Sequence, residues 1–422
     1  MTLLDLHHRH KKRLKIVDYQ CYNISCNNEK SRSYSGLKKQ IFVDVSELAH
    51  NDFKTGIQRV VRSILWYWLV TGVSMYRIEP VYSEVDRPGY KYAKRFTRDF
   101  LGLPSGAHID EPITFCSGDI FIALDLQHSV IQQEVSTFSK MKLAGVELNF
   151  VVYDLLPILH PHFFETHLHE LHDDWLNIIC KYGRLLCISK SVADEVKEWV
   201  GKNLPSGCKT PRIDWFHLGA DIQNSLPSQL IPNDTNYNLA KISECPVFLM
   251  VATIEPRKGH GQVLDAFENL WLKGAQLNLV IAGKKGWLVE DLCHRIRNHP
   301  ELHRRLFWLE GLSDEYLEKV YASSTCLIAA SYGEGFGLPL IEAAQHGLPI
   351  LARDIPVFRE VAGEYAAYFK AQTPFELARA IQSWLVDYEN ATHPKSNDIK
   401  YLTWKESSAV LLNMICQRGR LS

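Results

Sequence analysis

The chain has 422 residues, of which 46% are hydrophobic and 23% charged, and its formal net charge is -1 at pH 7. This length predicts two domains, because single hydrophobic cores stop growing at about 250–300 residues. The near-neutral charge argues against a nucleic-acid-binding protein, which usually carries a basic excess. No apolar run approaches the roughly 20 residues of a membrane-spanning helix, and the composition is typical of a soluble globular protein.

The N-terminus and the cysteines bear on where the protein works. Residues 1–40 are polar and basic, and we expect them to form a mobile extension that lacks the apolar core of a secretory signal. The ten cysteines occur singly, with no C-x-x-C pair, which predicts reduced side chains in a cytoplasmic protein. The basic run at residues 7–15 is either a solvated tail or a peripheral contact with anionic lipid on the inner face of the cytoplasmic membrane, where each Lys or Arg contributes about 1 kcal/mol.

The first predicted domain spans residues 41–225 and alternates strands with helices. Short apolar runs predict buried strands, and apolar residues at helical intervals predict a helix at 57–70. Ser189 is well placed to cap a further helix. The expected strands are residues 41–45, 119–124, 148–153 and 184–188, and residues 84–115 are expected to be a loop.

The second predicted domain spans residues 239–400 and follows a polar linker at about 223–238. It repeats the alternation, with a helix expected at 261–272. Two consecutive β/α series predict an α/β fold with two Rossmann-like, doubly wound domains facing a cleft, and ligands of such sheets lie at the carboxyl ends of the strands. The expected strands are residues 246–252, 277–283, 306–309 and 325–330.

The run from Ser331 to Ala344 is the most informative stretch for function. It places Glu334 in a turn with three glycines and Glu342 eight positions later on an apolar helical run. Three glycines so close are costly in chain entropy unless the backbone adopts unusual angles or touches a neighbour. Backbone N–H groups at a turn and at a helix N-terminus can hold phosphates, and carboxylates can hold hydroxyls. The run therefore predicts a sugar-nucleotide site, the alternative being a plain turn followed by a surface carboxylate.

A second charged segment follows the strand expected at 246–252. Arg257 and Lys258 lie there, just before the helix expected from Gly261. A guanidinium can hold two phosphate oxygens in a fork, and an ammonium adds a point charge. The pair is therefore a candidate for binding a diphosphate, and the alternative is two solvated basic residues in a loop.

Two residues of the first domain are further candidates. Gly56 lies in the loop after the first strand, where the absence of a Cβ would let the backbone approach a diphosphate. Asp154 ends another strand and could orient either the acceptor or the donor sugar. Each has a structural alternative, namely an ordinary loop glycine and a cap of the following turn.

Five histidines close together in the first domain invite a metal assignment. No Cys or repeated carboxylate spacing accompanies them, and two-histidine spacings alone specify little. We therefore predict no metal site at this cluster, which consists of His160, His162, His167, His169 and His172.

Several of these stretches resemble retaining glycosyltransferase family 4, whose members have the GT-B fold. The similarity extends over about residues 41–415. The start at residues 55–59 and the segment at residues 153–157 are similar to those of bacterial surface-polysaccharide mannosyltransferases. The resemblance implies that residues 401–422 form a C-terminal helix that crosses back onto the first domain. The stretches that carry the resemblance are residues 44–48, 55–62, 251–258, 307–317, 331–344 and 401–409.

The resemblance implies a role for each candidate residue. Glu342 would bind the ribose of the donor nucleotide, and Glu334 the transferred sugar. Arg257 and Lys258 would neutralise the leaving diphosphate. Backbone N–H groups of Phe336, Gly337 and Leu338 would meet the sugar and diphosphate, and the base would lie near Gly283, Lys284, Gly311 and Leu312. The sequence departs from the family at Thr253, where arginine is common, and at Tyr153, where histidine is common.

The function implied is transfer of a hexose, foremost mannose from GDP-mannose, to a hydroxyl of a growing, lipid-linked glycan in bacterial surface polysaccharide synthesis. The resemblance also implies retention at the anomeric carbon and no metal or other cofactor besides the nucleotide sugar. Two alternatives stay open. A sugar-nucleotide epimerase would act without an acceptor, and a catalytically silent scaffold of a polysaccharide assembly complex would bind no donor.

Overall fold

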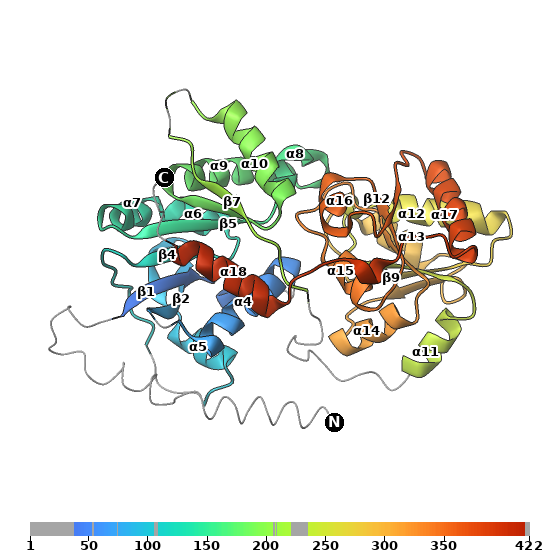
Figure 1. Cartoon of the computed structure of the whole chain (residues 1–422), viewed down its shortest axis with the longest axis horizontal. Coiled ribbons are helices and arrows are strands. Elements are labelled where there is room, and N and C mark those ends of the chain that lie inside the picture. Colours follow the sequence, from blue (N-terminus) through green and yellow to red (C-terminus); the bar gives the residue numbers. More distant parts are fainter. Residues whose placement is uncertain are drawn as a thin grey trace. The chain divides into compact units, whose positions relative to one another are not determined.

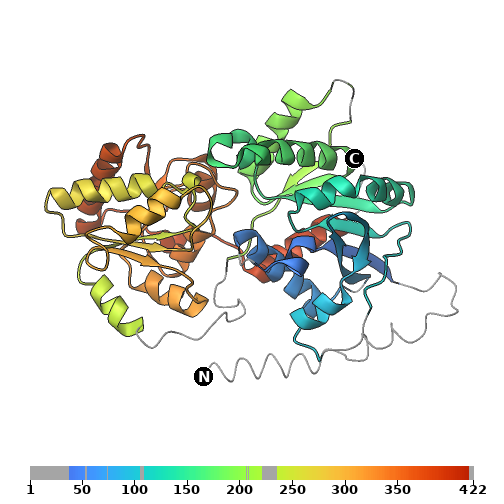
Figure 2. The ribbon, with the colours of Figure 1, turned by 180° about the vertical axis from the view of Figure 1, so that it is seen from behind.

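The computed structural model describes residues 38–417, except residues 53–54, 74, 105–108, 206, 208 and 221–234. Of the predicted extension at 1–40, residues 1–37 lie outside the described residues. Of the predicted linker at about 223–238, residues 223–234 also lie outside them. By its residue contacts the chain divides into residues 1–149 and 150–422. The colours of Figures 1 and 2 follow the chain through both units, from blue to red.

The first sheet has seven strands in the order β3-β2-β1-β4-β5-β6-β7. β1 runs parallel to both β2 and β4, and β2 and β3 form an antiparallel hairpin at the edge. From Gln40 onward every residue of β1 is buried, as expected for a parallel strand covered on both faces. The elements as far as β5 are β1 (Lys39–Asp44), α3 (Ser46–His50), α4 (Gly56–Thr71), β2 (Tyr76–Glu84), β3 (Arg87–Tyr92), α5 (Lys94–Phe100), β4 (Ile120–Ala123), α6 (His128–Gln133), α7 (Val135–Leu143) and β5 (Glu147–Val152).

The second sheet has six strands in the order β10-β9-β8-β11-β12-β13, and all of its pairs are parallel. This is the strand order of a doubly wound, Rossmann-like sheet. The elements from β8 to β13 are β8 (Val247–Val251), η4 (Pro256–Lys258), α12 (His260–Leu272), β9 (Asn278–Ala282), α13 (Glu290–Arg297), β10 (Leu306–Leu309), α14 (Asp314–Ala322), β11 (Cys326–Ala329), α15 (Leu338–Gln345), β12 (Ile350–Arg353), α16 (Pro356–Ala362) and β13 (Ala367–Phe369).

The remaining elements precede or follow the second sheet in sequence, and the last helix contacts residues near β6 and β7. Ser407 of α18 donates its hydroxyl to the carbonyl oxygen of His217 at 2.7 Å, and Arg184 donates to the carbonyl oxygen of Met414 at 2.5 Å. These elements are α8 (Leu156–Leu159), η2 (Pro161–Phe163), α9 (Thr166–Tyr182), β6 (Arg184–Cys187), α10 (Lys190–Asn203), β7 (Ile213–Trp215), α11 (Thr235–Ile242), α17 (Pro374–Glu389), η5 (Ser396–Asp398) and α18 (Trp404–Cys416).

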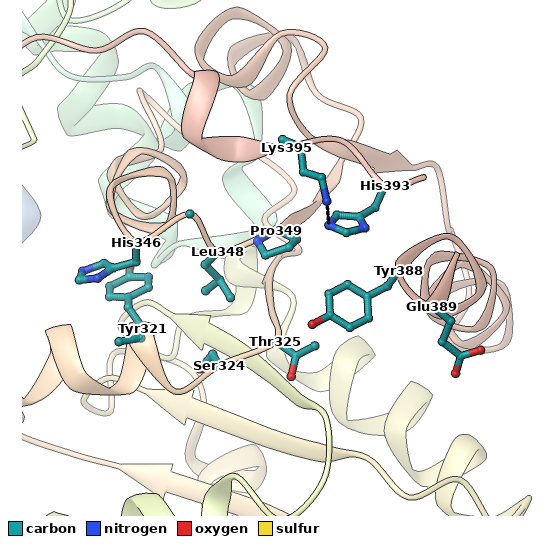
Figure 3. Close-up of a pocket in the computed structure, with 12 residues that line it drawn as sticks. Tyr321, Ser324, Thr325, His346, Leu348, Pro349, Tyr388, Glu389, His393 and Lys395 are labelled. Atoms are coloured by element: carbon teal, nitrogen blue, oxygen red, sulfur yellow. Dashed lines mark hydrogen bonds between the residues drawn. The ribbon is translucent and has the colours of Figure 1, made fainter. Parts of the chain in front are cut away.

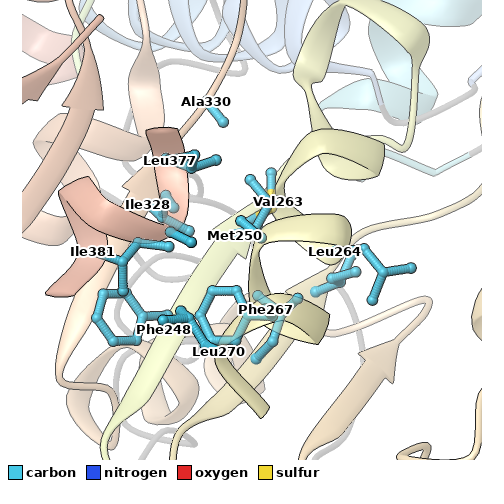
Figure 4. Packing of buried hydrophobic residues seen from close by; sticks show 14 of the residues in the cluster. Phe248, Met250, Val263, Leu264, Phe267, Leu270, Ile328, Ala330, Leu377 and Ile381 are labelled. Atoms are coloured by element: carbon cyan, nitrogen blue, oxygen red, sulfur yellow. The ribbon is translucent and has the colours of Figure 1, made fainter. Parts of the chain in front are cut away.

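The core of the second sheet lies between its strands and the helices α12 and α17, which lie side by side in both views of the ribbon (Figures 1 and 2). Phe248 of β8 packs against Phe267 of α12, with ring centroids 5.5 Å apart, and Ile381 of α17 belongs to the same buried cluster (Figure 4). Apolar residues spaced at three and four along α12 produce this buried stripe. Among the described helices, none combines the length and apolar character that crossing a membrane would require.

The predicted fold class is confirmed, and the predicted strands and the helices predicted at 57–70 and 261–272 agree with the structure to within one or two residues. The helix expected at 401–422 is shorter in the described residues, where α18 runs from Trp404 to Cys416. The predicted N-cap is also present, because Ser189 accepts a hydrogen bond from the Val192 N–H at 3.1 Å. The prediction of a loop at 84–115 is wrong, since β3 and α5 both lie in it. β3 contains Pro88 and Gly89, residue types that are depleted in strands. It forms a strand because it pairs with the antiparallel neighbour β2.

Candidate active site

The candidate site lies where the strand order of the second sheet reverses, between β8 and β11. Such a switch point is the usual ligand site of an open parallel sheet, because the loops leaving the two adjacent strands diverge there. The loop after β8 carries Arg257 and Lys258, and the loop after β11 carries Glu334. The Tyr332 N–H donates to the Arg257 carbonyl oxygen at 2.8 Å, which joins the two loops directly.

Three of the predicted residues form one ion cluster. Lys258 Nζ lies 2.5 Å from Glu334 Oε1, and Arg257 Nη1 lies 3.2 Å from Glu334 Oε2. The Ser331 hydroxyl donates to the same Oε1 atom at 2.7 Å. The three charged side chains are only 14–15% exposed. The structure thus brings together the two cations and the first glutamate, and it gives the glutamate three donors.

Burial and the two cations act in opposite directions on Glu334. Burial alone would raise its pKa, but the attraction of Lys258 and Arg257 outweighs burial and holds the pKa at about 2. For Lys258, burial and the neighbouring guanidinium lower the pKa, and Glu334 works against them. Glu334 is therefore the counter-ion that keeps two cations together in a poorly solvated place.

The sequence reasoning missed a fourth charged member of the cluster, Glu255. Its Oε2 atom lies 2.9 Å from Arg257 Nε, and its side chain is 7% exposed. Burial raises the pKa of Glu255, and Arg257 partly offsets that rise. The only signal in the sequence was its position two residues before Arg257, in the loop after a predicted strand. Other loop carboxylates share such a position.

Asp154 follows β5 and lies within electrostatic range of this cluster. Burial raises its pKa, and Arg257 has the largest opposing effect. Its carboxylate accepts the Leu156 N–H at 3.0 Å, so it also caps the following turn, as the structural alternative proposed. His172 lies with its Nε2 atom 3.0 Å from the Asp154 carbonyl oxygen, an anchoring role that the sequence did not indicate.

The glycines around Glu334 are explained by close approach and by backbone angle. A Cβ at Gly335 would overlap the carbonyl oxygen of Tyr153, and one at Gly333 would lie 2.5 Å from a methyl carbon of Leu156. Gly337 has φ of 96° and is the N-cap of α15, a conformation that glycine adopts at little cost. The glycine-rich turn is therefore pressed against the segment that carries Asp154.

The residues between the two glutamates have the following places. Phe336 is buried, and its ring centroid lies 5.4 Å from that of His217. Leu338 is the first residue of α15. The roles predicted for their backbone N–H groups, and for that of Gly337, stay predictions.

Glu342 lies in the second turn of α15, on the same helix whose N-terminus follows the glycine turn. It is 2% exposed, and its Oε2 atom accepts the hydroxyl of Tyr321 at 2.7 Å. The sequence reasoning did not indicate this partner, because Tyr321 comes from α14. The predicted contact of Glu342 with a ribose stays a prediction.

The other predicted donor-binding residues lie in loops that follow strands. Gly311 and Leu312 follow β10, with Gly311 at φ of 65°, so they leave the parallel sheet at the same edge as Glu334. Gly56 begins α4 in the other unit, where Thr55 and Gln58 form a capping box. Gly56 has open space around it, and its predicted approach to a diphosphate stays a prediction.

The histidine cluster supports the segment around Asp154. His169 lies with its Nδ1 atom 3.2 Å from the Pro157 carbonyl oxygen, which complements the contact of His172. Burial lowers the pKa of His172 to about 4. Within the part of the chain that the structure describes, no group of three or more His, Cys, Asp or Glu side chains is placed to hold a metal ion.

Comparison with known sequences identifies the second half of the chain. The family model of the group 1 glycosyl transferases matches residues 236–401. This range contains β8 to β13 and all four charged residues of the ion cluster, Glu255, Arg257, Lys258 and Glu334. The serotype-specific mannosyltransferase WbdA of Escherichia coli is 44% identical over 387 residues, which cover 90% of this chain and 47% of that protein. The chain thus spans about half the length of this curated relative.

Comparison with solved structures identifies the fold. Anabaena Alr3699/HepE in complex with UDP-glucose superposes with a TM-score of 0.56 at 14% identity, over 89% of this chain and 95% of that one. A glycosyltransferase from Rickettsia africae ESF-5 gives a TM-score of 0.57 at 15% identity, over 91% and 100% of the two chains. At such identities the likeness concerns the fold alone, which is GT-B. Residues 236–401 are therefore similar to the group 1 glycosyl transferases.

Proposed function

We propose that the chain is a retaining glycosyltransferase that moves mannose from GDP-mannose to a hydroxyl of a growing glycan. The observation that carries this proposal is the cluster of Arg257, Lys258 and Glu334 at the switch point of the matched domain. The choice of mannose is supported by the 44% identity to a protein named as a mannosyltransferase. The choice of a bacterial surface polysaccharide as the product rests on the family resemblance of the sequence.

The charges of the cluster suit the bond that breaks. When the anomeric carbon separates from the diphosphate oxygen, positive charge develops on the sugar and negative charge on the leaving diphosphate. Cations fixed before the reaction stabilise that leaving group without reorganising at the moment of transfer. Glu334 fixes both cations, and its negative charge lies where it would also favour the positive sugar.

The acceptor hydroxyl would attack the face from which the diphosphate leaves, so the anomeric configuration is retained. In that arrangement a departing phosphate oxygen takes the proton of the acceptor as the new glycosidic bond forms. No carboxylate of this chain is assigned as a covalent nucleophile. The part of Asp154 would be to orient a sugar hydroxyl beside the cluster.

The donor and the reaction class can be tested in one assay. The purified full chain is incubated with labelled GDP-mannose, UDP-glucose or a dTDP-hexose, each with and without a mannose-terminated acceptor glycan. We expect consumption of GDP-mannose only in the presence of the acceptor, and NMR of the product should give an α-linked mannose. Conversion without an acceptor would favour an epimerase, and the absence of nucleotide-sugar binding in calorimetry would favour a scaffold.

We also propose that the acceptor is lipid-linked and that the basic run at residues 7–15 holds the chain at an anionic lipid surface. These residues lie outside the described part of the chain. Their charge supports the proposal, since each Lys or Arg near such a surface contributes about 1 kcal/mol. Unchanged binding to phosphatidylserine vesicles after deletion of residues 1–15 would contradict it.

A further inference from the structure

A cavity of about 580 Å³ opens at the edge of the second sheet that is opposite to the candidate active site. Thr325 and Pro349 line it, and they lie directly before β11 and β12. The Glu334 loop follows β11, so the cavity and the loop lie at opposite ends of the same strand. The cavity is therefore separate from the site described above, although both belong to the matched domain.

Two pairs of contacting rings, one stacked and one tilted, form opposite walls of this cavity (Figure 3). On one side the ring of His346 stacks on Tyr321, with centroids 5.4 Å apart and planes inclined by 6°. On the other side Tyr388 contacts His393 at 5.0 Å. Trp384 stacks on Tyr388 at 5.1 Å and so restrains that ring. The cavity thus has ring walls in restrained orientations, and polar atoms make up much of its lining.

Polar groups complete the lining and nearly cancel in charge. Lys395 is a cation and Glu389 a carboxylate, and both are exposed. Lys395 Nζ lies 3.1 Å from His393 Nε2 (Figure 3). Burial, with the nearby ammonium, lowers the pKa of His393, and burial lowers that of His346. Both rings are therefore neutral at pH 7, and the cavity offers donors and acceptors without a net charge.

We propose that this cavity is a second, non-catalytic site that binds neutral sugar units of a glycan. The flat rings suit the apolar faces of a pyranose, and the hydroxyls, the imidazoles, Lys395 and Glu389 suit its hydroxyl groups. The volume lies within the roughly 300–1,000 Å³ of small-molecule sites. A phosphate or nucleotide diphosphate fits less well, because the lining holds Lys395 as its lysine or arginine cation and also the carboxylate of Glu389.

The cavity is also connected to the predicted donor site by one hydrogen bond. Tyr321, whose ring forms one wall, donates its hydroxyl to Glu342 at 2.7 Å. A sugar held against this wall would thus lie next to the side chain that positions Glu342. The identity of the sugar as mannose rests on the proposed function, whereas the existence of the site does not.

The test uses α-linked mannobiose as the probe and isothermal calorimetry on the full chain. We expect the Kd for mannobiose to rise roughly tenfold or more in Tyr388→Ala, which removes one wall of the cavity. Lys395→Met should raise it several-fold by removing one hydrogen-bond donor. Tyr401→Ala is the matched control, because Tyr401 is 42% exposed and Tyr388 38%, and it should leave the Kd unchanged. Thermal unfolding checks that each variant is folded. If Tyr388→Ala does not fold, the mannobiose affinity of Lys395→Met alone tests the proposal.

The outcomes separate this proposal from the proposed function. Loss of mannobiose binding in both cavity variants supports the second site, even if the unmodified chain consumes no GDP-mannose. Unchanged mannobiose binding in both variants overturns it, since the sugar then binds elsewhere. No mannobiose binding by a chain that does consume GDP-mannose also overturns it. A weakened affinity for GDP in Tyr388→Ala, with mannobiose unaffected, would mean that the cavity takes a nucleotide instead.

Discussion

The two sheets carry buried carboxylates at equivalent points, where the strand order reverses. In the first sheet, Asp44 ends β1 and Asp125 comes just after β4, and the Asp125 N–H donates to the Asp44 carbonyl oxygen at 3.2 Å. In the second sheet, Glu334 follows β11 beside the loop after β8. Each pair of adjacent loops is thus joined by one backbone hydrogen bond and holds a carboxyl group out of water.

Despite this shared position, the carboxyl groups differ in charge state. Burial raises the pKa of Asp44 to about 7, although the Ser46 and Tyr90 hydroxyls donate to it at 2.5 and 2.8 Å. Burial likewise raises the pKa of Asp125 to about 6. Glu334, paired with two cations, has a pKa of about 2. Hydroxyl and amide donors therefore do not replace a counter-ion, and of these three carboxyl groups only Glu334 keeps its charge well below pH 6.

The largest effect should come from removing a cation of the second switch point. We expect Lys258→Met to slow sugar transfer by about 10²–10³-fold, as the loss of a preorganised electrostatic group does. It should also lower the free energy of unfolding by about 3 kcal/mol, because the buried carboxylate of Glu334 loses one of its two cationic partners and keeps only Arg257. Turnover of labelled GDP-mannose and urea unfolding measure the two effects.

The matched control for this variant is Lys202→Met. Lys202 pairs with Glu198 at 2.6 Å, but both side chains are about two-thirds exposed, at 69% and 67%. Exposed pairs contribute at most about 1 kcal/mol, so this variant should retain both activity and stability. Near-normal transfer by Lys258→Met would contradict the role given to the cluster.

The next effect concerns the close approach beneath Glu334. In Gly335→Ala the new methyl group would overlap the Tyr153 carbonyl oxygen, so we expect a loss of about 1–3 kcal/mol in the free energy of unfolding and impaired transfer. Gly261→Ala, in open space near the start of α12, should instead stabilise the chain by about 0.4–1 kcal/mol. Equal effects of the two substitutions would refute the packing described here.

The pH dependence of stability should differ between the switch points. The pKa of Asp44 is raised in the folded chain from 3.8 to about 7, so its stabilising contribution is present below pH 3.8 and is lost as the pH rises through 7. For Glu334, whose pKa is lowered from 4.5 to about 2, the contribution is present above pH 4.5 and is lost as the pH falls through 2. Between pH 5 and 7, Asp44 and Asp125 titrate, whereas Glu334 stays ionised.

Asp44→Asn should therefore remove part of the decline in stability between pH 5 and 7, by about 1.4 kcal/mol for each pH unit. Urea unfolding of the variant and the unmodified chain at pH 5, 6 and 7 gives the comparison. Glu334→Gln should leave the slope over this range unchanged. A slope that is the same in Asp44→Asn as in the unmodified chain would show that Asp44 is ionised throughout.

The smallest effect should come from the partner of Glu342. Tyr321→Phe removes the hydroxyl that donates to this buried carboxylate, and we expect a loss of about 1–2 kcal/mol in the free energy of unfolding. The affinity for GDP-mannose should fall by a smaller factor than in Lys258→Met. Tyr82→Phe, which removes a longer bond to Asp110 at 3.3 Å, should have less effect on both quantities.

The sequence predicted the elements of both sheets that have strong apolar runs, and it predicted each charged residue of the Glu334 cluster except Glu255. It did not predict that Glu334 pairs with both cations, because the partners lie 76 and 77 positions apart along the chain. It also missed β3 and the Tyr321–Glu342 bond, which depend on pairing and packing between separate elements. Local patterns indicate which side chains reach the switch point, whereas their ionisation depends on tertiary neighbours.

Ser189 shows how the GT-B framework fixes the turn that holds Glu334. Its hydroxyl oxygen accepts the Val192 N–H at the start of α10, and its O–H group donates to the carbonyl oxygen of Gly335 at 2.7 Å. A single side chain thus both starts a helix and fastens the peptide next to the charged glutamate. Replacing it would loosen two elements at once, so thermal fraying of α10 and displacement of the Glu334 turn should appear together.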